Sequence, residues 1–254
     1  MHKSEKGWAL ITGASAGIGE ATALRLDQEG YSLLLVARRS DRLKKLQDKL
    51  KNPSQIFSVD LQKPSAISEF LKNAETQLKN VTVLVNNAGL AKGTEKFQDA
   101  ALADFDAMID TNVKALIAIT RGVLPYLLKN KKGHIVNIGS VAGRWVYPGG
   151  AVYAATKFAV RALSDALRMD LMGTGIRVTN IEPGMVESEF SLVRLGDKEK
   201  ADKVYSGMTP LTPSDIAETL SWCLDRPAHV NIQELVIFPT DQAGVGPSYV
   251  DRRV

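Results

Sequence analysis

Short apolar runs rich in β-branched residues alternate along this chain with longer segments of helical periodicity. The expected strands cover residues 8–12, 31–37, 55–59, 81–86, 134–139, 176–182 and 234–238. The expected helices cover residues 17–29, 40–50, 65–79, 100–129, 151–172 and 213–226. Several strand segments are hydrophobic nearly throughout, as in parallel strands covered on both faces. This alternation predicts an α/β fold, with a doubly wound parallel sheet of about seven strands and helices on both faces.

Two stretches interrupt the alternation. Residues 184–211, where the sixth strand ends, carry no regular period and are expected to be irregular. Residues 242–254 are expected to form a C-terminal tail that wraps over a neighbour. The sequence contains no internal repeat, low-complexity tract or Pro/Gly-rich linker, so we expect a single domain over residues 1–254.

The composition is that of a soluble globular protein. Of its 254 residues, 44% are hydrophobic and 24% are charged, which is enough to build one large α/β domain. No apolar run approaches the roughly 18 residues that cross a membrane. The first apolar stretch, "WALI" at 8–11, is too short for a signal-peptide core. We therefore expect a cytoplasmic protein with no membrane partner.

The charged, histidine and cysteine residues argue against two further classes of function. The formal net charge is +4, and the basic residues are scattered without aromatic interleaving, so nucleic-acid binding is not expected. His2, His134 and His229 lie far apart and no cysteine pair accompanies them, so we expect no metal site. The single cysteine, Cys223, rules out an internal disulfide and suits a reducing compartment.

The segment "TGASAGIGEA" at 12–21 joins the first expected strand to the first expected helix. Glycine lets backbone N–H groups approach a pyrophosphate at the positive end of a helix, and the hydroxyl of a serine adds a further phosphate ligand. A glycine-rich turn used only for packing is the alternative, but the strand before and the helix after favour nucleotide binding. The residues expected to contact the nucleotide here are Gly13, Ser15, Ala16, Gly17, Ile18 and Gly19.

The residues after the second strand indicate which nucleotide is bound. An NAD site usually has an acid about 20 residues beyond the glycines. This chain has Arg38 and Arg39 there instead. Two guanidiniums suit a 2′-phosphate and a carboxylate would repel it, so the sequence predicts NADP as the cofactor. The alternative is an arginine pair that is merely solvated before a helix.

Two further strand ends are expected beside the nucleotide. Asp60 and Leu61 follow the third strand, where the Asp60 carboxylate either accepts a hydrogen bond from an adenine amino group or caps a turn. Asn86 and Asn87 in "NNAG" end the fourth strand. They either tie neighbouring strand ends together below the cofactor or form a plain turn.

The segment "AVYAATKFAV" at 151–160 places Tyr153 and Lys157 one helical turn apart on the same face. Ser140 ends the fifth strand, in "NIGSVAG". A free phenol has a pKa of about 10, and an adjacent ammonium lowers it. Tyr153 could then exchange a proton with a carbonyl oxygen that Ser140 positions. The alternative is an amphipathic helix with a tyrosine at the edge of its buried stripe. Asn112, in "IDTNVKA", either binds a water that links Lys157 to solvent or is satisfied in a contact between helices.

Taken in order, these motifs resemble the short-chain dehydrogenase/reductase superfamily over nearly the whole chain. The resemblance rests on "TGASAGIG", "NNAG", Asn112, Ser140, "YAATK" and "PG" at 183–184. It implies a Rossmann-type oxidoreductase acting on a CH–OH group, with a catalytic tetrad of Asn112, Ser140, Tyr153 and Lys157. It also implies that "PGMVESEF" at 183–190 closes over the nicotinamide. The further cofactor contacts that it implies are Asn87, Tyr153, Lys157, Pro183, Gly184, Val186 and Ser188.

A narrower similarity concerns "GRWVYPGGAVYAATK", "NIEPGMVESEFSLVR" and "PAHVNIQELVIFPTDQAG". These segments look like the NADP-dependent 3-hydroxy acid dehydrogenases, which implies oxidation of serine or allo-threonine and reduction of malonic semialdehyde. In this branch 184–211 is a substrate lid. Two features depart from the branch: the segment "SLVRLGDKEKADK" is slightly shortened, and Arg144 stands at a variable position.

A short hydroxy acid is an anion, and an anion needs a cation or several donors near the pocket. Arg144, just beyond Ser140, and Arg194, in the lid, are the basic residues best placed by sequence. For either arginine alone, the alternative is a solvated or structural role without contact to the substrate. The expected substrate contacts are therefore Ser140, Tyr153, Arg144 and Arg194.

The apolar pattern of two expected helices also predicts how the protein assembles. Apolar residues of 151–172 spread over more than one helical face, which predicts a symmetric interface together with 100–129. With the family resemblance this favours a homotetramer.

Two rival functions remain. One rival function is a sensor that binds NADP without turnover, although an intact set of Ser140, Tyr153 and Lys157 argues against it. The other is a sister reductase of carrier-bound ketoacyl chains, steroids or sugars.

Overall fold

The computed structural model describes residues 6–252, and within them seven parallel strands form one sheet. The outermost residues of the expected domain and tail, 1–5 (with His2) and 253–254, lie outside the described residues. The strand order is β3-β2-β1-β4-β5-β6-β7. The strands are β1 (Trp8–Thr12), β2 (Ser32–Ala37), β3 (Ser54–Ser58), β4 (Val81–Asn86), β5 (Gly133–Ile138), β6 (Ile176–Pro183) and β7 (Glu234–Ile237). The doubly wound α/β fold is confirmed, and each strand boundary agrees with the prediction within one residue.

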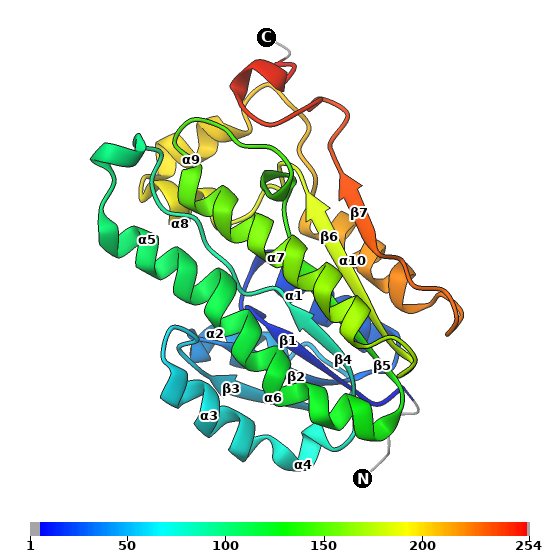
Figure 1. Cartoon of the computed structure of the whole chain (residues 1–254). Coiled ribbons are helices and arrows are strands. Elements are labelled where there is room, and N and C mark those ends of the chain that lie inside the picture. The colour runs from blue at the N-terminus through cyan, green and yellow to red at the C-terminus, as the bar shows by residue number, and fades with distance from the viewer. Residues whose placement is uncertain (1–5, 253–254) are drawn as a thin grey trace.

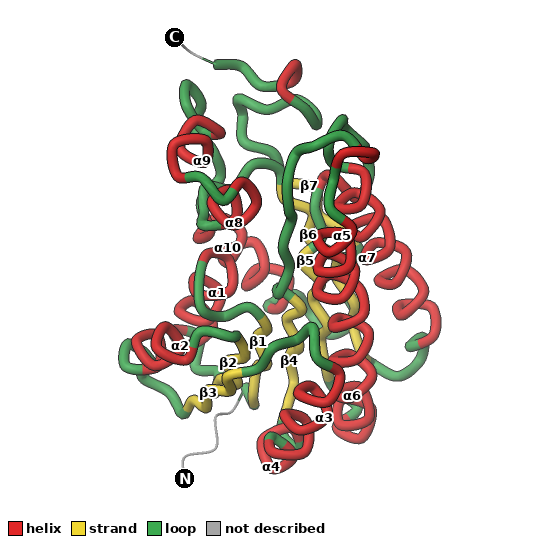
Figure 2. The backbone as a smooth tube through the Cα atoms, turned by 90° about the vertical axis from the view of Figure 1, so that its left-hand side faces the viewer, coloured by secondary structure: helices red, strands yellow, loops and turns green. Residues whose placement is uncertain are grey.

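Helices cover both faces of this sheet (Figures 1 and 2). They are α1 (Gly17–Gln28), α2 (Ser40–Gln47), α3 (Pro64–Asn73), α4 (Glu75–Leu78), α5 (Leu102–Ile109), α6 (Ala115–Asn130), α7 (Ala151–Asp170), α8 (Phe190–Leu195), α9 (Lys198–Val204) and α10 (Pro213–Leu224). In Figure 2, α1, α2 and α10 lie on one side of the strands, and α3, α6 and α7 lie on the other.

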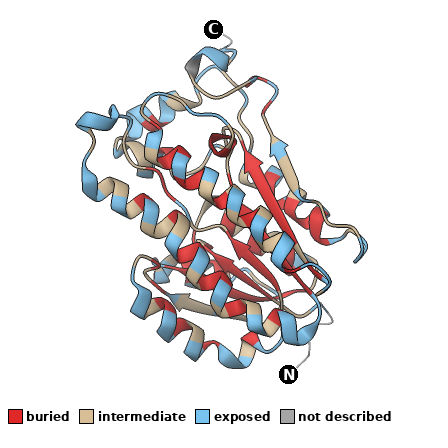
Figure 3. Cartoon of the chain, viewed as in Figure 1, coloured by how far each residue is buried: buried red, intermediate tan, exposed pale blue. Residues whose placement is uncertain are grey.

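The alternation of side chains along β2 shows how both faces become buried. Leu33 and Leu35 belong to the apolar cluster that contains residues of α1 and α10. Leu34 and Val36 belong to the cluster on the opposite face, with residues of α3 and α6. Successive side chains of a strand point to opposite faces, so a strand covered on both sides must be apolar at every position. Figure 3 shows the buried strands between helices whose outer faces are exposed.

Three expected segments differ from the structure. The helix expected over 65–79 is divided between α3 and α4 at Ala74. The helix expected over 100–129 consists of α5 and α6, joined by the π-helical segment Asp110–Lys114. The expectation of an irregular 184–211 is partly wrong, because this segment contains α8 and α9. Short helices with few turns carry little periodic signal, which is why the pattern missed them.

The described part of the tail, residues 242–252, packs against its own chain. Gln242 and Val250 form an isolated antiparallel bridge. The Arg252 guanidinium donates hydrogen bonds to the carbonyl oxygens of Val204 and Ser206, at the end of α9. The tail therefore covers the same end of the molecule as α8 and α9, which is the end where the strands terminate (Figure 1).

Candidate active site

A cavity of about 750 Å³ opens at the carboxyl ends of the strands, below α8. Open parallel sheets bind ligands at this edge, because the loops after successive strands meet there. The predicted residues that line it are Gly13, Ser15, Ala16, Gly17, Ile18, Arg38, Arg39, Asp60, Leu61, Asn87, Ser140, Tyr153, Lys157, Pro183, Gly184, Val186, Ser188 and Arg194. Three predicted site residues are not among the lining residues: Gly19, Asn112 and Arg144.

The loop between β1 and α1 has the backbone that its glycines were expected to allow. Gly13 and Gly17 have φ values of 67° and 55°, in the left-handed region that favours glycine. A Cβ on Gly19 would lie 2.3 Å from the carbonyl oxygen of Gly13, so Gly19 permits close packing of the loop. The Asn87 side-chain amide donates to the carbonyl oxygens of Thr12 and Gly13, at 2.9 and 3.2 Å. Asn87 therefore ties the end of β4 to this loop.

Asn86 and Asp60 make hydrogen bonds within the protein that stabilise the ends of two strands. The Asn86 amide donates to Thr120 Oγ1 and Asn137 Oδ1, both at 2.9 Å, so it joins β4 to α6 and β5. The Asp60 Oδ1 atom accepts a 3.2 Å hydrogen bond from the Gln62 backbone N–H. The turn-capping interpretation of Asp60 thus describes its contacts, although its side chain also lines the cavity.

The turn after β2 brings two arginines to one end of the cavity. Arg39 donates from Nε and Nη2 to Ser15 Oγ, at 3.4 and 3.3 Å. Its Nη1 atom also donates to Glu189 Oε2 at 2.9 Å. Arg38 is exposed, and its guanidinium has no ion-pair partner among residues 6–252. The turn with Arg38 and Arg39, called the arginine turn below, therefore places positive charge near the glycine loop, which joins β1 to α1.

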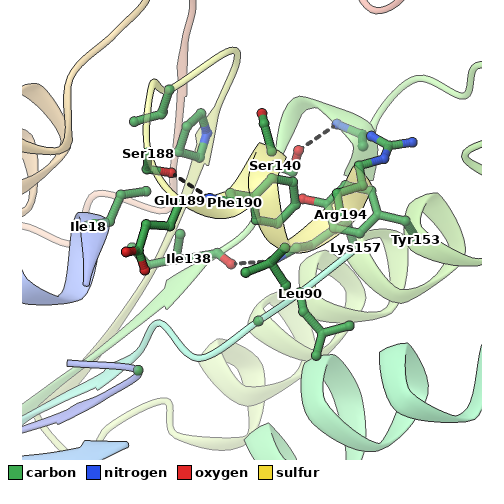
Figure 4. A pocket seen from close by; sticks show the side chains of 18 of the residues that line it. Ile18, Leu90, Ile138, Ser140, Tyr153, Lys157, Ser188, Glu189, Phe190 and Arg194 are labelled. Carbon is green, nitrogen blue, oxygen red and sulfur yellow. Dashed lines mark hydrogen bonds between the residues drawn. The ribbon is translucent and has the colours of Figure 1, made fainter. Parts of the chain in front are cut away.

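At the other end of the cavity, Ser140 and Tyr153 lie together (Figure 4). Ser140 precedes a short 3-10 turn, where its Oγ accepts a 3.1 Å hydrogen bond from the Ala142 N–H. Tyr153 is 9% exposed, and its ring lies 5.7 Å from that of Phe190 in α8. Burial raises the pKa of Tyr153, and the hydrogen bond with Ser140 opposes that rise. The phenol therefore keeps its proton at neutral pH.

Lys157 lies one turn beyond Tyr153, but its amine is directed elsewhere. Its Nζ atom donates a 2.8 Å hydrogen bond to the carbonyl oxygen of Ile138 and lies 5.8 Å from the centre of the Tyr153 ring. Burial lowers the pKa of Lys157 from 10.5 to about 8. The expectation that Lys157 lowers the pKa of Tyr153 is wrong for this structure, because burial dominates and the opposing influences are Ser140 and Arg194.

Asn112 is 2% exposed and lies in the π-helical segment between α5 and α6. Its Oδ1 accepts from the Leu90 N–H at 2.9 Å, and its Nδ2 donates to the Leu90 carbonyl at 2.8 Å and to Thr156 Oγ1 at 3.0 Å. A π-helical turn is rare and shifts the side chains that follow it. In the structure Asn112 fastens the chain after β4 to α7, as the helix-contact interpretation proposed.

Arg194, the last-but-one residue of α8, lines the cavity. It donates from Nε to the Gly93 carbonyl and from Nη1 to the Tyr147 hydroxyl oxygen, both at 3.0 Å. No carboxylate lies within ion-pair distance of it in the described part of the chain. It is thus a partly buried cation without an ion pair among these residues, close to Tyr153. It is also near enough to Glu95 to help backbone hydrogen bonds lower the pKa of that carboxyl.

Arg144 does not reach the cavity, which corrects its prediction as a substrate contact. It forms ion pairs with Glu182 of β6 and Glu234 of β7. Glu182 is fully buried, and Arg161 completes the network by pairing with Glu234 at 2.9 Å. Buried carboxylates require such partners, so Arg144 has a structural function here.

Tyr147 and Glu189 are among the polar residues of the cavity that sequence reasoning missed. Tyr147 lies six residues before Tyr153 in "GRWVYPGGAVY", and a polar aromatic so close to the expected acid was an available signal. Glu189 lies in "PGMVESEF", and its pairing with arginines far away in sequence gave no signal. Among residues 6–252, no group of three or more His, Cys, Asp or Glu side chains could hold a metal ion.

Comparison with known proteins decides the family. The family model for short chain dehydrogenase matches residues 7–197. This chain belongs to the short-chain dehydrogenase family. The predicted resemblance and the predicted oxidoreductase class are thereby confirmed.

Three similar proteins carry more specific names. The NADP-dependent 3-hydroxy acid dehydrogenase YdfG of Salmonella typhimurium is 47% identical, over 94% of this chain and 97% of that protein. Sulfoacetaldehyde reductase 2 of Chromohalobacter salexigens is 44% identical, over 92% of this chain and 94% of that protein. A structure described as the closed form of serine dehydrogenase complexed with NADP+ has a TM-score of 0.90 and 46% identity, over 94% of this chain and 97% of that one.

Proposed function

We propose that this short-chain dehydrogenase transfers a hydride between NADP(H) and a small 3-hydroxy or 3-oxo acid. Serine, allo-threonine and 3-hydroxypropionate are the proposed alcohols, and malonic semialdehyde is the proposed aldehyde. One observation carries this conclusion: the acid Tyr153, the hydroxyl of Ser140 and Arg194, which forms no ion pair among residues 6–252, line the same end of one cavity. The names of the similar proteins support the same substrate class.

The residues at the other end of the cavity suit NADP. The glycine loop offers backbone N–H groups to the diphosphate, and a side chain on Gly19 would disturb that cradle. We assign the 2′-phosphate to Arg38 and Arg39, and the adenine to Asp60 and Leu61. Asn87, Lys157, Pro183, Gly184, Val186 and Ser188 are the proposed contacts of the nicotinamide half. Bound NADPH supplies the hydride.

Residues of the chain itself donate and accept the proton that accompanies the hydride. Because burial raises the pKa of Tyr153, its phenol is protonated at neutral pH and can donate to the developing alkoxide. Ser140 donates a hydrogen bond to the same oxygen and so fixes its position. In the oxidative direction Tyr153 must first lose its proton. Lys157 is a proposed contact of the nicotinamide half, and its amine, with a pKa of about 8, donates its hydrogen bond to the carbonyl oxygen of Ile138.

Arg194 and Tyr147 are the proposed substrate-anion contacts. The Tyr147 hydroxyl oxygen accepts from Arg194, which leaves its own proton free to donate to a substrate. A hydroxyl donor beside a guanidinium matches the two oxygens of a carboxylate. Ser140 and Tyr153 complete the proposed substrate contacts at the reacting oxygen.

We also propose that the protein is a cytoplasmic homotetramer, with a small molecule as its substrate and neither nucleic acid nor membrane as a partner. Large apolar side chains remain exposed on the helices expected at an interface: Leu102 is 76% exposed, Ile117 43% and Met169 69%. Such patches are typical of surfaces between subunits. Within residues 6–252 no helix is long and apolar enough to cross a bilayer. Cys223 is buried as a free thiol.

The direct test is NADPH oxidation by the full chain with a panel of carbonyl substrates. Malonic semialdehyde should give the highest kcat/KM, well above a ketoacyl thioester, a ketosteroid and a ketose. Sulfoacetaldehyde, also an anion, is the informative competitor, because one similar protein is named for it. A higher kcat/KM with an uncharged ketone would favour the sister-reductase alternative. No turnover together with tight NADPH binding would favour the sensor.

A further inference from the structure

Glu189 lies directly before α8 and forms ion pairs with two arginines from another part of the chain. Its Oε2 atom accepts from Arg39 Nη1 at 2.9 Å, and its Oε1 atom accepts from Arg42 Nη1 at 2.5 Å. Arg39 follows β2, and Arg42 lies in α2. We call Glu189, Arg39 and Arg42 the Glu189 bridge. It joins the segment that covers the cavity to the turn proposed for the 2′-phosphate.

Figure 4 shows where this carboxylate lies. Glu189 projects beside Ile18 of the glycine loop, at the opposite end of the pocket from Tyr153 and Arg194. Glu189 and Arg39 both line the cavity, whereas Arg42 does not. Arg42 therefore contacts the carboxylate from outside the cavity, and Arg39 contacts it from inside.

The bridge places a full negative charge next to the cation that the cofactor needs. The hydrogen bond from Arg42 lowers the pKa of Glu189, so the carboxylate is ionised at neutral pH. The Arg39 guanidinium also donates to Ser15 Oγ, on the glycine loop. A phosphate that approaches Arg39 thus meets a group of its own charge, already hydrogen-bonded to the same guanidinium.

We propose that Glu189 is a specificity-determining residue, which competes with the 2′-phosphate of NADP(H) for Arg39. This inference rests on the proposed NADP site. Carboxylate and phosphate use the same guanidinium N–H groups, and two like charges beside one cation repel each other. Glu189 therefore weakens the binding of a nucleotide that carries a 2′-phosphate and leaves a nucleotide without one unaffected. Arg42 moderates the competition because it binds the other oxygen of the carboxylate and offsets part of its charge.

Equilibrium binding to the full chain tests this without any dependence on activity. Adenosine 2′,5′-bisphosphate is the probe, and adenosine 5′-monophosphate is the matched ligand without the 2′-phosphate. Glu189→Gln removes the charge and keeps the shape. Glu187→Gln is the control, because it removes an exposed acid from the same segment that forms no ion pair within the described residues.

Glu189→Gln should bind the bisphosphate about fivefold more tightly than the wild type, with an unchanged Kd for the monophosphate. Glu189→Asp keeps the charge and should stay near the wild-type value, and Glu187→Gln should change neither Kd. Unchanged or weaker bisphosphate binding by Glu189→Gln would overturn the proposal. Equal affinity for the two probes in both the wild type and Glu189→Gln would instead remove the 2′-phosphate site itself, and the inference with it.

Arg42→Ala distinguishes competition from direct contact. If Arg42 acts through Glu189, its loss should weaken bisphosphate binding in the wild type by about fivefold and have no effect in the Glu189→Gln background. An equal loss in both backgrounds would show that Arg42 itself binds the phosphate, and the competition would be rejected.

Discussion

Arg194 donates a 3.0 Å hydrogen bond to the Tyr147 hydroxyl oxygen, and its guanidinium lies 5.4 Å from the centre of the same ring. The two residues come from α8 and from the loop before α7, so their contact joins α8 to the segment that leads into α7. Arg194 also lies close enough to Tyr153 to lower its pKa. One cation thus faces both the proposed acid and the proposed position of the substrate carboxylate.

Loss of this cation should affect substrate binding. Arg194→Ala should raise the KM for 3-hydroxypropionate by about tenfold to a hundredfold, because a charge-assisted hydrogen bond contributes about 1.5–3 kcal/mol. Tyr147→Phe should raise it less, since a neutral donor is lost. Steady-state kinetics measures both. An unchanged KM in both variants would remove the pair from substrate binding and leave the reaction type intact.

Tyr153→Phe keeps the ring and removes the proton. Turnover should fall by about a hundredfold to ten-thousandfold, the usual contribution of a general acid, while NADPH binding is retained. The ring packing against Phe190 is preserved, so the thermal stability should stay the same. NADPH oxidation and nucleotide titration measure the two properties separately. Near-normal turnover in this variant would show that another group donates the proton.

The arginine turn should determine the choice of cofactor. The wild type should prefer NADPH over NADH by about tenfold or more in kcat/KM, since contacts to a charged group contribute roughly 1.5–3 kcal/mol each. The double variant Arg38→Ala, Arg39→Ala should lose this preference through a higher KM for NADPH. Equal kcat/KM values for the two cofactors in the wild type would refute the assignment.

Arg144 should matter for stability and not for substrate binding. Arg144→Met leaves the fully buried Glu182 without a main partner, and breaking a buried pair on one side costs about 3–5 kcal/mol. Because Arg144 is itself 21% exposed, we expect a loss near the lower end of that range, measured by urea unfolding. Arg144→Lys should recover part of it. A rise in substrate KM at unchanged stability would restore Arg144 to the substrate site.

The burial of the His134 imidazole leads us to expect a loss of folding stability in acid. It is 2% exposed, its Nε2 lies 2.7 Å from Thr179 Oγ1, and burial lowers its pKa from 6.5 to about 3. Between these two pKa values the unfolded chain binds a proton that the folded protein does not. Stability is therefore complete above pH 6.5 and is lost as the pH falls, by about 1.4 kcal/mol per pH unit from this group.

Urea unfolding at a series of pH values tests this linkage. His134→Gln should lose that part of the pH dependence, and replacement of the exposed His229 by Gln should keep it. If wild type and His134→Gln lost stability in parallel on acidification, the buried imidazole would not be its source.

The sheet and the glycine loop were predictable because their signals are local. A strand such as β2 must be apolar at every position to be covered on both faces, and β2 is. Gly13 and Gly17 have the positive φ values that a tight loop at the start of α1 requires. Ser140 and Tyr153 were predictable because Ser140 lies two residues after β5 and Tyr153 lies in the first turn of α7, and the alternation defines the positions of both elements.

The remaining features depend on contacts between residues far apart in sequence. The pairing of Arg144 with Glu182 and Glu234 joins three elements, and nothing near Arg144 indicates it. The direction of the Lys157 amine depends on its hydrogen bond to the carbonyl oxygen of Ile138, which helical spacing does not reveal. The π-helical turn at Asn112 occurs within a continuous helical pattern, so the sequence predicted one long helix there.

The most direct test of the proposed function compares 3-hydroxypropionate with its methyl ester as substrates for NADP+ reduction by the wild-type protein. The two alcohols share the reacting carbon and differ in the charge that Arg194 is proposed to bind. We expect kcat/KM to be about tenfold to a hundredfold higher for the acid. We also expect Arg194→Ala to remove most of this difference. An equal or higher kcat/KM for the ester would contradict the proposed function.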